Sequence, residues 1–502
     1  MIAQRFSAGQ GEQAPHRASP SNRRARHRTW PTVMVALGSV VLAAVAEAHT
    51  GERAYLRLLP TEHYLWGGAL VVALSFALVG WLPRGLGARL RSSARALVTL
   101  HPPRWPSAIT LALLVMLVAS GLVGRRDPLD NPLPTVVWSV WWAGFTAAHA
   151  LLGNLWGVLS PWPALYRLVR PGASRARARR LRYPSALGTW PAVGVLAVFA
   201  WTELVYPAPQ DPARLAVAVA AYAAFTALGM AIFGPRAWLA RAEAFTVYFR
   251  MVARNAPLAT RAAGDGRRTV VARWPASGLL AVRRWSPSQT AFVLLALSAV
   301  SFDGLSRTFW WVSTIGHNPL EYPGRTVLMA WNTLGLLGTF TALAAGYLLA
   351  VALGRRLGGP PTHHRRWSVL VGSIVPIAFG YHLAHYLPYL IVDAQYALRA
   401  MGDPFDLDWN LLGLRDLHVH AAFLSDHVAV VHVWRFQVAA IVGAHVLAVL
   451  VAHAALLDAR PPACGAAEAP PRGVWMSLTP LTVLMVGYTV LGLWLLSTPS
   501  VG

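Results

Sequence analysis

The sequence contains no lysine, because all 44 of its basic residues are arginine. It contains one cysteine, Cys464, which excludes an internal disulfide and a paired-cysteine metal site. Charged residues are scarce, at 13% of the 502 residues against about 25% in soluble domains, whereas hydrophobic residues reach 55%. This composition is typical of a protein that crosses a membrane many times.

The sequence lacks the motifs of several functional classes. No Walker or Rossmann glycine pattern stands beside a strand, and there is no nucleophile elbow. A formal net charge of +24 is found in many nucleic-acid-binding proteins. Here, however, the arginines lie between apolar runs and do not form one amphipathic face. We therefore expect no nucleic-acid partner.

Apolar runs follow one another along almost the whole chain. Each is close to the ~20 residues that cross ~30 Å of hydrocarbon. Helices satisfy their own backbone in lipid, and the runs are too long and uniform for barrel strands. We predict an all-α fold, a polytopic transmembrane helix bundle of about 10–11 spanning helices without a large soluble domain. The runs are residues 31–48, 64–82, 106–123, 135–157, 186–206, 214–234, 288–305, 326–353, 368–396, 428–457 and 475–497.

The gaps between these runs are alternately rich and poor in arginine. The gaps on one side hold 34 arginines, and those on the other side hold nine. Because cytoplasmic loops retain basic residues, we predict that the rich side is cytoplasmic, in the inner membrane of a bacterium. The longest rich loop is 235–287, and its segment 242–249 is predicted to be an interfacial helix near anionic lipid. The loop 397–427 carries Asp and His outward, as solvated surface or, alternatively, as a weak divalent-cation site.

Residues 1–48 are predicted to form a separate segment before a single transmembrane domain at 49–502. Arginines in residues 1–30 precede the first apolar run, which ends in an Ala-Glu-Ala cleavage pattern at 46–48. One interpretation is a cleaved signal peptide, which leaves His49 at a new N-terminus able to chelate copper. The other interpretation is an uncleaved first helix.

Histidines lie inside two neighbouring runs. His382 and His385 are three residues apart and share one helix face. A rise of 1.5 Å per residue from the centres of the runs places His445 within roughly 5 Å of the level of His382. We predict a centre for Zn, Cu or Fe at His382, His385 and His445, with His432 and His49 as further candidate ligands. Because two facing imidazoles also suit a haem iron, haem b is the alternative cofactor.

Three carboxylates are predicted at the outward ends of their runs. Glu203 and Asp303 lie on runs that travel outward, and Asp393 follows the histidines along the ninth run. At one level they are candidates to ligate a metal or to act as a general base. The alternative is that each is a helix-end residue in contact with water.

Four short motifs and two longer stretches carry a further signal. The motifs are Ser-Pro-Trp at 160–162, Trp-Thr-Glu-Leu-Val-Tyr-Pro at 201–207, Glu-Ala-Phe-Thr-Val-Tyr-Phe at 243–249 and Ser-Phe-Asp-Gly-Leu at 301–305, and the stretches are 375–395 and 437–453. In this order and combination they resemble a bacterial family of polytopic membrane proteins known as fenitrothion hydrolases. The resemblance spans about 49–453.

The resemblance implies hydrolysis of an organophosphorus triester at its P–O–aryl bond. The expected partners are then the lipid bilayer and a small hydrophobic ester, and no oligomeric state is indicated. A metal held by His382, His385 and His445 would polarise the phosphoryl oxygen and acidify bound water. Asp393 or Asp303 would orient or deprotonate that water.

Two other functions use the same histidines. A copper transport or handling protein would pass the metal ion from the outer loop past His432 to His385 and His382. It would then pass to His445 and His453. A membrane haem protein would hold haem b between His382 or His385 and His445.

Overall fold

The computed structural model describes residues 61–79, 86–169, 181–357, 364–458, 472–499 and 501. Within these residues, nine helices are long and apolar enough to cross a membrane. This confirms the predicted all-α helix bundle and a multi-pass membrane protein. The predicted run 31–48, its cleavage pattern and His49 lie outside the described residues.

The nine helices coincide with nine of the predicted runs. Several begin at a polar cap followed by proline, as at Asp211, which caps α10, and at Ser286, which forms a capping box with Gln289 at the start of α14. The spans are α4 (Trp105–Val123), the continuous α5 (Pro132–Thr135), η3 (Val136–Phe145) and α6 (Thr146–Leu152), α9 (Trp190–Leu204), α10 (Pro212–Phe233), α14 (Pro287–Ser306), α16 (Arg325–Leu357), α17 (Ile374–Met401), α18 (His427–Asp458) and α19 (Arg472–Ser497).

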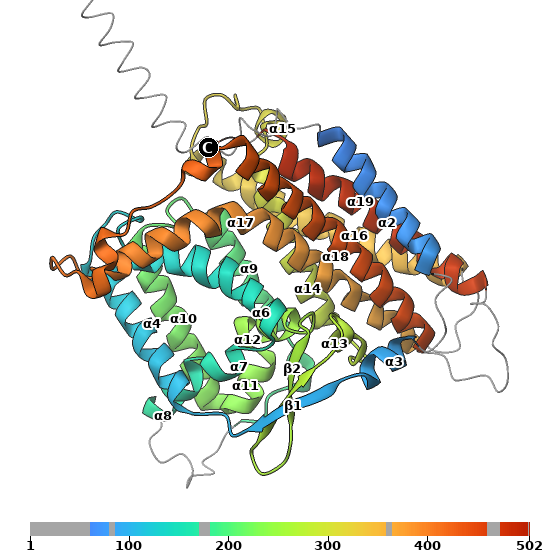
Figure 1. Cartoon of the computed structure of the whole chain (residues 1–502), viewed down its shortest axis with the longest axis horizontal. Coiled ribbons are helices and arrows are strands. Elements are labelled where there is room, and N and C mark those ends of the chain that lie inside the picture. Colours follow the sequence, from blue (N-terminus) through green and yellow to red (C-terminus); the bar gives the residue numbers. More distant parts are fainter. Residues whose placement is uncertain are drawn as a thin grey trace, which may run out of the picture. The chain divides into compact units, whose positions relative to one another are not determined.

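The long helix α17 lies in the middle of the helix arrangement (Figure 1). It packs against α18, α14 and η3. On one side, α2 (Thr61–Val79) packs on α18 and α19, and on the other side α10 packs on α4. Polar side chains of α17 therefore meet several other helices.

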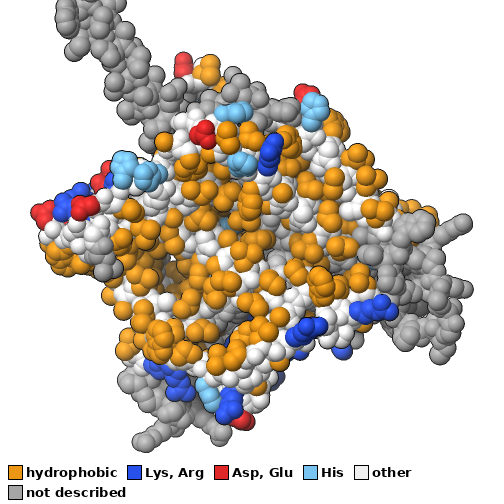
Figure 2. All heavy atoms as spheres, viewed as in Figure 1, with side chains coloured by type: hydrophobic (Ala, Val, Ile, Leu, Met, Phe, Trp, Pro, Cys, Tyr) orange, Lys and Arg blue, Asp and Glu red, His pale blue; other side chains and the backbone are white. Residues whose placement is uncertain are grey.

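The outer surface of the spans is apolar. Large side chains such as Leu113, Val198, Leu228 and Val483 are exposed. Figure 2 shows hydrophobic side chains across the middle of the visible face, whereas charged and His side chains lie toward its upper and lower edges. Basic side chains are more frequent along the lower edge, and acidic and His side chains along the upper edge. Because soluble proteins rarely expose apolar patches of this size, lipid is the natural cover for this belt.

A small antiparallel sheet interrupts the helical fold, and no strand was expected from the sequence. Its order is β1 (Arg95–Leu100), β3 (Arg268–Ala272) and β2 (Leu258–Ala262). The Thr99 and Thr269 hydroxyls are 2.8 Å apart across the β1–β3 pair. The sheet thus joins two of the arginine-rich segments between spans.

The segment predicted as an interfacial helix is instead buried. It forms α12 (Ala244–Val252), which packs against α9, α6 and α17. The Glu243 carboxylate caps this helix by accepting hydrogen bonds from the backbone N–H groups of Phe245 and Thr246, and it also accepts one from the Tyr222 hydroxyl. The physical reason for the difference is the near absence of a polar face, since seven of its nine residues are buried.

Helices α17 and α18 approach each other closely at Gly380. A Cβ atom there would lie 2.3 Å from the Ala444 Cβ and 2.9 Å from the Ala440 carbonyl oxygen. Small residues at such crossings let helix backbones meet in a membrane. The crossing lies just before His382 and therefore fixes the height of the α17 histidines against α18.

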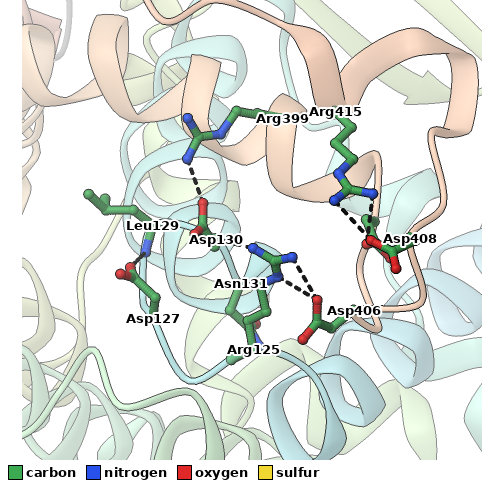
Figure 3. Close-up of polar contacts among 10 residues, drawn as sticks. Arg125, Asp127, Leu129, Asp130, Asn131, Arg399, Asp406, Asp408 and Arg415 are labelled. Carbon is green, nitrogen blue, oxygen red and sulfur yellow. Dashed lines mark hydrogen bonds and ion pairs between the residues drawn. The ribbon is translucent and has the colours of Figure 1, made fainter.

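Arginines pair with carboxylates of the loop 397–427 and of the segment before α5 (Figure 3). Arg125 contacts Asp406 at 2.7 Å, Arg399 contacts Asp130 at 2.5 Å, and Arg415 contacts Asp408 at 3.0 Å. The hydrogen bond to Asp406 is the main cause of the raised pKa of Arg125. The first pair joins the loop before α5 to the loop after α17, and the second joins the loop before α5 to the last turn of α17. The third lies within the loop after α17.

Candidate functional site

The candidate site is a buried polar cluster of α9, α14 and α17, centred on the carboxylate of Asp303. Asp303 is 2% exposed. Its Oδ2 accepts hydrogen bonds from His385 Nε2 at 2.9 Å and from the Tyr386 hydroxyl at 2.8 Å. Its Oδ1 lies 3.3 Å from Arg307 Nη2. A carboxylate with this set of partners keeps its negative charge inside the bundle, because each contact replaces lost hydration.

A second carboxyl group joins the cluster through one shared hydroxyl. The Tyr386 hydroxyl lies 2.9 Å from Glu203 Oε1 as well as 2.8 Å from Asp303 Oδ2. A phenol carries a single hydrogen, so it donates fully to one carboxylate at a time. If Glu203 carries a proton, it donates that proton to the Tyr386 oxygen while Tyr386 donates to Asp303. The two carboxyl groups are therefore linked through a single hydroxyl.

The spacing of the residues explains how α14 and α17 contribute to this cluster. Arg307 follows Asp303 by four residues and lies at the C-terminal end of α14, where a cation also meets the helix dipole favourably. Arg307 Nη1 also donates to the Tyr389 hydroxyl at 2.9 Å. Because Tyr389 is four residues beyond His385, both lie on one face of α17.

His382 lies one turn from His385 and has a different partner. Its Nε2 donates to the Trp142 carbonyl oxygen at 3.1 Å, and its ring meets the Trp142 indole edge-on at 4.9 Å between centroids. Trp142 belongs to η3, a π-helical segment. Such segments carry i→i+5 hydrogen bonds and frequently occur at functional sites.

His445 on α18 is separate from this contact set. Its Nδ1 donates to the Ile441 carbonyl oxygen at 2.8 Å, which leaves a lone pair on Nε2. That Nε2 atom is buried and has no hydrogen-bond partner in the described part of the chain, and the residue is 1% exposed. His445 is thus a histidine with an unused acceptor inside the bundle.

The other predicted site residues lie elsewhere. Asp393 accepts a hydrogen bond from the Ser139 hydroxyl at 2.6 Å, and it is eight residues, about 12 Å, beyond His385 along α17. His432 is exposed on α18. The structure thus joins Asp303 with Glu203 and leaves Asp393 in a separate contact.

The predicted metal ligands do not meet as one group. His382 contacts a carbonyl of η3, His385 contacts Asp303, and His445 contacts a carbonyl of its own helix. Over the residues that the structure describes, there is no group of three or more His, Cys, Asp or Glu side chains that could hold a metal ion. The metal and haem assignments therefore remain predictions.

Two site residues were not anticipated from the sequence. Arg307 had a detectable signal, because it stands four residues after an intramembrane Asp at a helix end. The Trp142 carbonyl had no such signal, since any residue carries a carbonyl and only the π-helical backbone brings this one to His382. Comparison of the chain with protein-family models, curated proteins and solved structures found no match.

A double-mutant cycle tests the central ion pair. Asp303→Asn removes the countercharge of Arg307, whose side chain is 34% exposed and therefore partly screened by solvent. We expect Asp303→Asn and Arg307→Gln each to lower the free energy of unfolding in detergent. We expect the double variant to lose less than their sum, with a coupling energy of about 1 kcal/mol.

The matched control pairs Arg307→Gln with Asp393→Asn, because Asp393 contacts Ser139 instead. The losses in the free energy of unfolding caused by these two substitutions should be additive. A coupling energy in the Asp303 cycle no larger than in this control would show that the ion pair does not hold the cluster together.

Proposed function

We propose that the protein is a membrane-embedded hydrolase of small hydrophobic esters, with the cluster of Asp303, His385, Tyr386 and Glu203 as its acid–base centre. The observation that carries the proposal is the hydrogen bond from His385 Nε2 to the buried carboxylate of Asp303. The resemblance to fenitrothion hydrolases supports an aryl phosphotriester as substrate. A neutral triester of this kind dissolves in the bilayer around the spans.

The His385–Asp303 pair suits general base catalysis. Because Nε2–H donates to Asp303, the other ring nitrogen, Nδ1, has the lone pair that accepts a proton. The carboxylate fixes this tautomer and stabilises the imidazolium once it forms, as in hydrolase triads. Tyr386 and Arg307 hold the Asp303 carboxylate in position. Glu203 also contacts the Tyr386 hydroxyl, and its protonation state determines which carboxyl group receives the Tyr386 hydrogen bond.

The proposed reaction is hydrolysis of the triester by one water molecule, and it needs no other reactant. His385 Nδ1 takes a proton from water while the water oxygen bonds to phosphorus. The P–O–aryl bond breaks, and its electron pair leaves on the aryl oxygen. The imidazolium returns its proton to that oxygen, so the products are a phosphodiester acid and a phenol, and His385 is neutral again. No step passes through a metal ion.

Metal handling is a second candidate function, favoured by one observation. His445 Nε2 is a buried imidazole acceptor without a partner in the described residues, and unprotonated imidazole is a ligand for Cu, Zn and Fe. His382, His385 and His445 would serve as stages of a path or, in the haem alternative, as axial ligands. A path requires the side chains to act in turn, so it needs no three-ligand group.

We also propose that the arginine-rich gaps face the cytoplasm of a bacterial cell, with the Asp303 end of α14 outward. The asymmetry of 34 to nine arginines supports this orientation. The membrane is then the inner membrane, and the ester reaches the cluster from the outward half of the bilayer.

Hydrolysis of a nitrophenyl phosphotriester by purified protein tests the enzyme proposal. Release of nitrophenolate is followed by absorbance. We expect His385→Gln to lower turnover by about 10²–10⁴-fold, the range for loss of a general base. Tyr386→Phe should have a smaller effect, because it removes a positioning group only.

The control for this assay is His101→Gln, which changes an exposed histidine away from the cluster. It should keep full turnover. Absence of turnover in the unchanged protein, or equal turnover in His385→Gln, would refute the enzyme proposal.

Copper entry into reconstituted vesicles tests the second candidate. A trapped chelating dye should report entry that is reduced by His445→Ala and unchanged by His101→Gln. No entry, together with ester turnover, would leave the hydrolase as the remaining function. A Soret band in the absorption spectrum would instead support haem b.

Thiol labelling tests the orientation, because the chain has one natural cysteine. A maleimide that does not cross membranes should label Cys464 only after the cells are opened. Leu320→Cys in a Cys464→Ser chain should react in spheroplasts with an intact inner membrane, since Leu320 is exposed in an arginine-poor gap. The opposite pattern would mean the reverse orientation.

A further inference from the structure

A cleft of about 530 Å³ lies between α14 and α16, away from the cluster. Most of its lining residues lie in the first half of α14 and in α16 from Phe340 onward. The others are Arg284 and Trp285, just before α14, and Ser368, just before α17. Leu294 and Asp303 are nine residues apart on α14, about 13 Å along the helix. The cleft and the proposed acid–base centre are therefore different places on the same helix.

Among its described lining residues, the cleft carries hydrogen-bond donors and no carboxylate. Arg284 lines it and makes no ion pair within the described residues. Trp285 also lines it, but its Nε1 atom is buried and points toward Gly372, where a Cβ atom would lie 3.3 Å from it, so the indole offers the cleft an apolar surface. Thr290 and Tyr347 also line the cleft, and their hydroxyls make no hydrogen bond to any described residue. This donor set, with one positive charge, suits an anion.

The rest of the cleft is apolar. Leu294, Phe340, Ala344 and Leu348 line it, and Leu348 is exposed on the outer surface of α16. An apolar groove that opens toward the hydrocarbon matches an acyl chain. A small soluble anion would use the donors and leave this groove unfilled.

We propose that the cleft binds a phospholipid with an anionic head group. The phosphate lies against Arg284 and Thr290, and one acyl chain runs between α14 and α16. The position agrees with this assignment, because Trp285 comes just before the span, where indoles sit at the membrane interface. Anionic lipid is also attracted to basic residues at a cytoplasmic surface, the side on which Arg284 is proposed to lie. This site does not depend on the proposed hydrolase.

Native mass spectrometry of the full chain in detergent tests the site. The probes are dioleoylphosphatidylglycerol and dioleoylphosphatidylcholine, titrated separately. The unchanged protein should retain the anionic lipid more tightly. Arg284→Gln should weaken binding of the anionic lipid about tenfold, the effect of losing one charge-assisted hydrogen bond, and leave phosphatidylcholine unchanged.

Arg283→Gln is the matched control, because Arg283 is an exposed neighbour that does not line the cleft. It should bind both lipids as the unchanged protein does. Ala344→Phe should reduce binding of both lipids by filling the groove, and a melting curve confirms that each variant is folded. Equal losses in Arg283→Gln and Arg284→Gln, or normal binding by Ala344→Phe, would overturn the proposal.

Discussion

A negative charge inside a membrane bundle must be given partners by the protein, and the arrangement of α9, α14 and α17 meets this requirement at Asp303. A bare carboxylate in hydrocarbon costs several kcal/mol, so it persists only where donors surround it. His385, Tyr386 and Arg307 supply these donors from two helices. Their geometry in turn fixes the rotation of α17 about its axis relative to α14.

The same constraint links the cluster to the rest of the bundle. The rotation that places His385 on Asp303 also turns His382 toward the π-helical segment η3, where its Nε2 finds the Trp142 carbonyl. The close crossing at Gly380 holds α17 against α18 at the correct height. One helix therefore contacts three neighbours through residues that lie within six positions of one another.

Much of the fold could be predicted from the sequence, because membranes impose simple rules. Apolar run length predicted the nine spans found in the described residues. The burial of α12 was missed because its segment stands between arginines, although its own residues lack a polar face. The sheet was missed because β1 pairs with a strand that is far away in sequence and because all its residues are exposed.

The candidate site was predictable in its residues and less so in their partners. Asp303, Glu203 and His385 were all named from their intramembrane positions. Sequence spacing gives the height of a side chain along a helix and does not give its rotation toward a particular neighbour. For this reason His445 was expected beside His382, whereas each donates to a different carbonyl. The outer carboxylates were likewise expected together, and Asp393 turned to Ser139.

The pairing of β1 with β3 has a consequence for synthesis on the ribosome. Strands β2 and β3 are neighbours in the chain and are available to each other once both have emerged, whereas β1 pairs with residues about 170 positions later. Strand β1 leaves the ribosome before α4, and its partner follows α10 and α12. Its backbone groups therefore stay bonded to water while several spans are inserted. The three-stranded sheet is therefore complete only after the spans between β1 and β3 have been synthesised.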